Sequence, residues 1–178
     1  MPTDTVFGIC GSIKSKKAQE KLKSIKERPA SKPFPIMCAD IDQIKSITMI
    51  DNKSEKIIRE LMPGPITIVL RKNSQLPEYI NSGKETIAIR MATSNELKEL
   101  IKILGCPVFM TSANKSGEEV CKTLDDIERK CPDLDGMLEG NVSFGQASTI
   151  VDCTSNEIKI LRKGPISEDG IIKALNKT

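Results

Sequence analysis

Lys26 and Arg28 lie two residues apart, directly before Pro29, and this spacing could bring two cations to one place. Converging cations suit a triphosphate, whose negative charge is costly to hold without paired donors. A pair of cations facing solvent is the alternative interpretation. The sequence contains no histidine, which excludes a histidine general base and Ser-His-Asp or Cys-His hydrolase chemistry. Reactions that need a histidine are therefore excluded.

Two further stretches place polar side chains on or after apolar runs. Arg90 lies near the end of the run TIAIRM, residues 86–91. A buried cation is costly unless it meets an anion, so we expect a carboxylate or phosphate partner, with an internal salt bridge or a water-facing strand end as the alternative. The stretch TSANKSG, residues 111–117, includes Ser112 and Asn114. Short donors, free backbone N–H groups and little bulk are typical of a small-molecule cradle, although an ordinary turn is the alternative.

Hydroxyl groups also occur near both ends of the chain. Thr3 and Thr5 flank an aspartate at the start, and Ser148 begins a predicted hairpin that ends at Arg162. Neither GxxxxGK[ST] nor GxGxxG is present, so the sequence has no P-loop or Rossmann fingerprint.

These residues must be positioned by alternating strands and helices. Apolar and β-branched runs predict strands at about residues 5–9, 36–38, 66–71, 86–91, 107–110, 148–153 and 158–162. Helical spacing and capping residues predict helices at about 15–26, from 41, 54–61, 93–104, 124–129 and from 167. We expect N-caps at Ser15, Asp40, Thr123 and Ser167, and a capping box between Thr93 and Glu96. The pattern indicates an α/β fold with a mixed sheet.

Composition limits the class of protein. With 178 residues, 38% of them hydrophobic and 29% charged, the chain is expected to form one globular domain over residues 1–178. Aromatic residues are only 3%, which argues against a platform that stacks single-stranded bases. No apolar run is long enough to span a bilayer and no signal-peptide pattern is present, so a cytoplasmic protein without membrane contact is expected.

Charge and cysteine content give weaker indications. Residues 1–33 carry eight lysines or arginines and three acids, a net +5 within a chain of net charge +3. Such a segment could serve polyanions such as ATP or tRNA, or could be a solvated helix face. The six cysteines form no CxxC pair, so buried reduced thiols are expected rather than a zinc site.

Seven stretches, taken in order, resemble one family. They are PTDTVFGI, IKERPASKPFPI, PGPITIVL, IAIRM, TSANKSG, STIVD and LRKGPI, and they run from Pro2 to Ile166. Together they are similar to the successive signatures of the YrdC-like threonylcarbamoyl-AMP synthases. The resemblance implies a twisted mixed sheet flanked by helices around a basic concave cavity.

The resemblance also implies an activity. Members of this family combine L-threonine, bicarbonate or CO2, and ATP to form threonylcarbamoyl-AMP and pyrophosphate. A tRNA threonylcarbamoyl-transferase machinery then modifies tRNA, and some members contact tRNA or double-stranded RNA. Mg2+ is expected together with ATP. Adenylyl transfer depends chiefly on positioning and electrostatics, which fits a chain without histidine.

Carried over by motif, the resemblance assigns roles to nine residues. Catalysis and the ATP phosphates fall to Lys26 and Arg28. The threonine site comprises Thr3, Thr5, Arg90 and Ser112, and the nucleotide side is completed by Ser112, Asn114, Ser148 and Arg162.

The sequence departs from the family pattern in three places. Phe7 stands where many relatives have tyrosine, although other members also carry phenylalanine. Ala92 and Thr93 stand where proline and often histidine are usual, a change that bears on the threonine pocket. Relatives also usually have a helix and a strand before the first motif, whereas this sequence begins at that motif. The alternatives are a non-catalytic module that binds double-stranded RNA or tRNA on the same fold, and a carbamoyl-transfer relative of the domain in hydrogenase-maturation proteins.

Overall fold

The computed structural model describes residues 1–3, 5–142 and 147–177. Its centre is one mixed sheet of eight strands in the order β1-β6-β2-β5-β4-β7-β8, with β3 paired to β4 outside this path. The strands are β1 (Gly8–Ser12), β2 (Ile36–Cys38), β3 (Thr48–Met49), β4 (Ile66–Lys72), β5 (Thr86–Met91), β6 (Val108–Ser112), β7 (Thr149–Asp152) and β8 (Lys159–Arg162). The helices are α1 (Lys16–Lys26), α2 (Ile41–Ile47), α3 (Asn52–Leu61), α4 (Asn95–Ile103), α5 (Leu124–Lys130) and α6 (Glu168–Asn176), with a 3-10 turn, η1, at Glu78–Asn81.

The two faces of the sheet are covered differently. Within β2, Ile36 and Cys38 belong to the main apolar cluster, whereas Met37 between them belongs to a second, smaller cluster. Successive strand residues point to opposite faces, so the two clusters lie on opposite sides of the sheet. Every helix except α4 contributes buried residues to the main cluster, and α4 packs on the second face through Leu97 and Ile101. The rest of that second face is left for a cavity.

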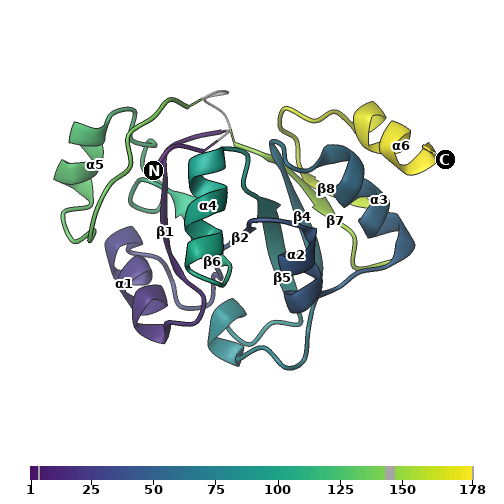
Figure 1. Ribbon diagram of the computed structural model, residues 1–178, viewed down its shortest axis with the longest axis horizontal. Helices are drawn as coiled ribbons and strands as arrows, with labels where there is room; N and C mark the ends of the chain where they lie inside the picture. The colour runs from purple at the N-terminus through teal and green to yellow at the C-terminus, as the bar shows by residue number, and fades with distance from the viewer. Residues whose placement is uncertain (4, 143–146, 178) are drawn as a thin grey trace.

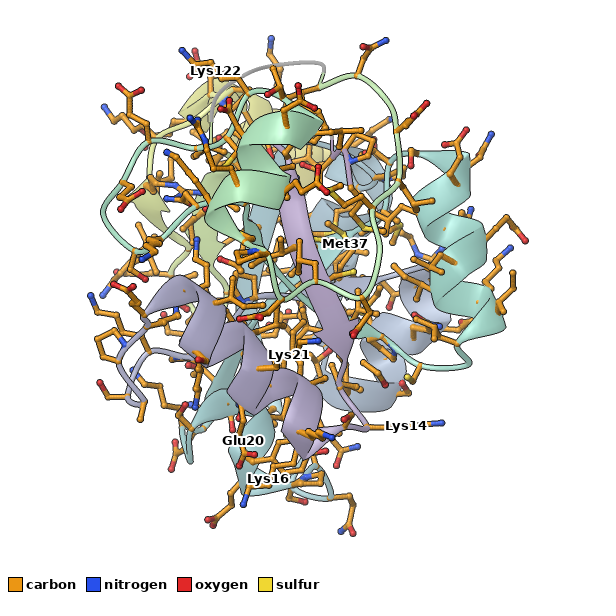
Figure 2. The ribbon with its side chains drawn as sticks, turned by 90° about the vertical axis from the view of Figure 1, so that its left-hand side faces the viewer. Lys14, Lys16, Glu20, Lys21, Met37 and Lys122 are labelled. Atoms are coloured by element: carbon orange, nitrogen blue, oxygen red, sulfur yellow. The ribbon has the colours of Figure 1, made fainter. Side chains whose placement is uncertain are left out.

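The helices are distributed along the sheet as Figure 1 shows, with α1 and α5 at the β1 end and α3 and α6 near β7 and β8. Figure 2 views the β1 end and shows Lys16, Glu20 and Lys21 on the outer side of α1, while Met37 is fully buried inside the molecule. Much of the positive charge of the N-terminal segment is therefore presented to solvent along α1.

The sheet contains both parallel and antiparallel pairs, as the sequence predicted. The β2–β5 and β4–β7 pairs are parallel, and the β1–β6, β2–β6, β4–β5 and β7–β8 pairs are antiparallel. The four predicted N-caps are confirmed, since Ser15, Asp40, Thr123 and Ser167 each accept a backbone N–H bond with the side chain.

Two local predictions were wrong. The first strand begins at Gly8 rather than residue 5, because the backbone N–H and C=O of Val6 are bonded to Thr3 Oγ1 and not to a neighbouring strand. The capping box at Thr93 does not form. Ser94 caps α4 instead by accepting from Leu97 N, because sheet pairing continues as far as Ala92 and leaves Thr93 as the connecting residue.

Other element boundaries differ less. The strand predicted to end at residue 110 continues to Ser112, and the helix predicted from residue 54 begins at Asn52. All six cysteines are free, four of them buried and Cys10 and Cys153 half-buried. No helix in the described part of the chain is long and apolar enough to cross a membrane.

Candidate active site

A cavity of about 300 Å³ lies on the second face of the sheet. Seven of the nine predicted site residues line it: Thr3, Thr5, Arg28, Arg90, Ser112, Ser148 and Arg162. Larger hollows of about 580 and 520 Å³ lie beside the N-terminal residues, but Thr3 is the single predicted residue that lines them. The smaller cavity is therefore the candidate site.

Sheet register explains how residues from distant segments meet there. Thr67 on β4 pairs with Ile150 on β7, and Ile150 pairs with Arg162 on β8. On the other side of β4, Ile68 pairs with Ile89 of the antiparallel strand β5. The residue before Ile68 therefore lies next to the residue after Ile89, which places Thr67 beside Arg90. Directly paired residues point to the same face of a sheet. One row of side chains, Arg90, Thr67, Ile150 and Arg162, thus crosses the floor of the cavity.

The threonines at the start of the chain contact one end of this row. Arg90 Nη1 donates to Thr5 Oγ1 at 3.1 Å, and the hydroxyls of Thr5 and Thr3 lie 3.2 Å apart. Both threonines are buried. Hydroxyl groups and a guanidinium are thereby held together beneath the chain start, as the motif predicted.

Arg162 is anchored at the opposite end of the row. Its Nε donates to Ser148 O at 2.9 Å and its Nη2 to Ser148 Oγ at 3.1 Å. Burial lowers the pKa of Arg162, and the positive charge of Arg90 lowers that pKa further. No aspartate or glutamate occurs among the described residues that line the cavity, and its guanidiniums and hydroxyls are groups suited to bind an anion.

Arg28 adds a third guanidinium from the loop after α1. It lies over the ring of Phe34, 5.0 Å from the centroid, and donates to Lys32 O at 3.0 Å and to Pro33 O at 2.8 Å. Burial lowers the pKa of this arginine as well. The proline loop therefore fixes the direction of Arg28.

Lys26 and Asn114 lie behind Ser112 rather than in the lining of the cavity. Lys26 is only 2% exposed, and its Nζ donates to Ser112 O and to Asn114 Oδ1, both at 2.7 Å. Burial, with the nearby charge of Arg28, lowers the pKa of Lys26 to about 8. Asn114 Oδ1 also accepts from Ser112 Oγ at 2.6 Å, and Asn114 Nδ2 donates to Glu118 O. These contacts make the lysine part of a fixed, positively charged wall.

A family model covers most of the chain. Residues 1–164 match the Sua5/YciO/YrdC model, whose description reads "Telomere recombination". The chain belongs to the Sua5/YciO/YrdC family.

Members of the Sua5/YciO/YrdC family with curated names are similar over most of this chain. A putative threonylcarbamoyl-AMP synthase of Methanocaldococcus jannaschii is 32% identical over 166 residues, which cover 92% of this chain and 78% of that protein. The threonylcarbamoyl-AMP synthase of Bacillus subtilis is 32% identical over 177 residues, 96% of this chain and 50% of that protein. The chain thus spans about half the length of the Bacillus protein and about three quarters of the Methanocaldococcus protein.

A solved member of the family has the same fold. The structure of P. abyssi Sua5 complexed with L-threonine superposes with a TM-score of 0.82 at 28% identity, over 98% of this chain and 52% of that one. The expected YrdC-like fold is therefore confirmed.

Several residues of the family motifs at or beside the cavity were not predicted as part of the site, and two of them bear on its structure. Thr67, within PGPITIVL, lines the cavity and its Oγ1 lies 2.7 Å from Ser148 Oγ. Gly164, within LRKGPI, packs against the backbone of Ser148 and Thr149, where an added Cβ would lie 2.4 Å from Thr149 N. The available signal for Thr67 was a hydroxyl in an otherwise apolar strand, and β-branched residues are common in strands for other reasons.

The described residues do not supply a protein-held magnesium site. They contain no group of three or more His, Cys, Asp or Glu placed to hold a metal ion, and those lining the cavity offer hydroxyls and cations rather than carboxylates. Mg2+ prefers carboxylate and phosphate oxygens. The described residues of the cavity are therefore unsuited to hold Mg2+ by themselves.

Proposed function

We propose that this chain is an L-threonylcarbamoyladenylate synthase, a nucleotidyltransferase. It combines L-threonine, bicarbonate or CO2, and ATP to give threonylcarbamoyl-AMP and pyrophosphate. One observation carries the proposal: three guanidiniums, of which that of Arg90 is buried, and several hydroxyls converge on one cavity whose described lining contains no carboxylate. Such a site favours a ligand that carries both a carboxylate and phosphates, as threonine and ATP do together.

The reaction requires two bond-forming steps. The amine of threonine attacks the carbon of CO2 and loses a proton, which gives a carbamate. A carbamate oxygen then attacks the α-phosphorus of ATP, the bond to the β-phosphate bridge oxygen breaks, and pyrophosphate leaves. The cations offset the negative charge that develops on the phosphoryl oxygens, and no histidine is needed to do so.

Each site residue has a proposed part in these steps. Arg90 binds the carboxylate of threonine, and Thr3, Thr5 and Ser112 bind its polar groups. Arg28 and the wall built by Lys26 stabilise charge at the phosphates, Asn114 holds this wall, and Ser148 and Arg162 complete the nucleotide side. The contact between Arg90 and Thr5 supports placing the carboxylate at that end.

The partners follow from the same activity. ATP is proposed to bring Mg2+ on its phosphates, since the described lining offers no carboxylate for the ion. The product is proposed to pass to a tRNA threonylcarbamoyl-transferase machinery in the cytoplasm. The lysines on the outer side of α1 are a proposed place for tRNA contact (Figure 2).

The proposal is tested by measuring pyrophosphate release from ATP. We expect release when L-threonine and bicarbonate are both present and only background release when either is omitted, with threonylcarbamoyl-AMP detected by mass spectrometry. Equal release with serine in place of threonine contradicts the substrate assignment. No release, together with salt-dependent binding of double-stranded RNA, would favour the non-catalytic alternative.

A further inference from the structure

Thr67 lies between Arg90 and Arg162 in the row of side chains that forms the floor of the cavity. It is 3% exposed, and its neighbours along β4, Ile66 and Ile68, point to the main core on the other face. A valine would fill the same space as threonine at this position. The shape of the core therefore does not explain a threonine here, and the hydroxyl needs another reason.

The hydroxyl of Thr67 is bonded within the site. Its Oγ1 lies 2.7 Å from Ser148 Oγ, and Ser148 Oγ also accepts from Arg162 Nη2 at 3.1 Å. We propose that Thr67 is a positioning residue for the phosphates of the nucleotide, which it serves by fixing Ser148 and, through Ser148, the guanidinium of Arg162. This inference rests on the proposed function.

Counting protons supports this role. Each hydroxyl has one proton to donate, and Arg162 already supplies the proton of its bond to Ser148. Only one further proton is used between Thr67 and Ser148, whichever of the two donates. One hydroxyl proton of the pair therefore remains to be donated to a ligand, and both residues line the cavity.

The positive charges near this hydroxyl donor also favour an anionic ligand. Thr67 lies between Arg90 and Arg162 in the row, and Ser148 contacts both Thr67 and Arg162. Burial lowers the pKa of Arg162, and the positive charge of Arg90 lowers it further. When Thr67 donates to Ser148, the hydroxyl proton of Ser148 remains to be donated to a phosphate group beside it and beside Arg162. Loss of either hydroxyl would leave the other with more rotational freedom and would weaken this contact.

The experiment compares ATP binding by calorimetry for wild type, Thr67→Val, Ser148→Ala and the double variant. We expect Thr67→Val to weaken ATP binding about tenfold. L-threonine binding should change little, and Thr67→Ser should restore ATP affinity. Because Thr67 acts through Ser148, the double variant should lose no more affinity than Ser148→Ala alone.

Thr48→Val is the matched control. Thr48 is also a buried threonine, but its Oγ1 donates to Ile44 O at the end of α2 and it does not line the cavity. This variant should lower the melting temperature without changing ATP affinity. Unchanged ATP affinity in Thr67→Val, or losses that add in the double variant, would overturn the inference.

The two proposals can fail separately. Wild-type protein that binds neither ATP nor L-threonine would overturn the proposed function and this inference together. Wild-type protein that forms threonylcarbamoyl-AMP while Thr67→Val binds ATP equally well would overturn the role of Thr67 alone.

Discussion

The cavity has two positively charged sides that are built differently. On the Lys26 side, the ammonium donates to Ser112 O and Asn114 Oδ1 and is almost fully enclosed. On the floor, Arg90 and Arg162 are bonded to hydroxyl groups that themselves line the cavity. The lysine side therefore provides an enclosed ammonium held in one position, whereas the floor has hydroxyl and guanidinium donors that line the cavity.

Lysine on one side and arginine on the other respond differently to burial and to pH. A lysine pKa shifts readily on burial, and that of Lys26 falls to about 8, so its charge depends on pH in the physiological range. An arginine remains protonated even when burial lowers its pKa, as it does for Arg162. The difference predicts that pH acts on the lysine side and that loss of a specific ligand contact acts on the floor.

The largest effect is expected from Arg90→Ala. Removing this guanidinium takes away the proposed partner of the threonine carboxylate, and truncating a buried charged partner typically costs about 100-fold or more in affinity. Calorimetric titration should show that loss for L-threonine and a much smaller change for ATP. Equal losses for both ligands would remove Arg90 from the threonine site.

A smaller, pH-dependent effect is expected from Lys26. As pH rises through about 8, the lysine loses its charge and ATP affinity should fall several-fold. Lys26→Arg should remain charged, so its ATP affinity should stay level over the same range. Calorimetry between about pH 6.5 and 9.5 measures both profiles, and parallel profiles would contradict the assignment.

The ionisation of Lys26 also affects the stability of the fold, and its contribution to stability changes with pH in the direction opposite to that of ATP affinity. The pKa of Lys26 is lower in the folded state than the ordinary value of 10.5, so the unfolded chain binds more protons between pH 8 and 10.5. The contribution of Lys26 to the free energy of unfolding therefore rises with pH in this window. Deprotonation of Lys26 therefore does not destabilise the fold over this window, and a fall in ATP affinity that depends on Lys26 reflects its lost charge.

Local features of the fold could be predicted from the sequence. Caps such as Ser15 and Asp40 depend on bonds within a few residues, and these were correct. The family motifs also predicted seven residues that do line one cavity. The capping box at Thr93 failed because pairing of Ala92 with Cys38, a contact between distant segments, determines where the strand ends.

The inner arrangement of the site could not be predicted in this way. Thr67 meets Ile150 and Arg162 only because β4 pairs with β7 and β7 with β8, and this register depends on the packing of the whole sheet. The position of Lys26 behind Ser112 likewise depends on where α1 ends relative to β6. The sequence motifs proposed the residues but could not show which of them line the cavity and which lie behind its lining.

The smallest effect is expected from Gly164→Ala, which tests how closely the floor of the cavity is fitted. A Cβ at this position would lie 2.4 Å from Thr149 N and 2.6 Å from Ser148 C, so the backbone that carries Ser148 must shift. We expect a loss of about 1–3 kcal/mol in the free energy of unfolding and ATP affinity lowered by a few-fold. Denaturant titration and calorimetry measure the two effects.

Gly136→Ala is the control for that substitution, because a Cβ there would meet nothing within 4 Å. It should leave both measurements at wild-type values. The L-threonine affinity of Gly164→Ala should also remain near that of wild type, since Arg90 and Thr5 lie at the other end of the row. If Gly164→Ala weakens threonine and ATP binding equally, the two ends of the floor move as one unit, and the distinction between a threonine end and a nucleotide end is wrong.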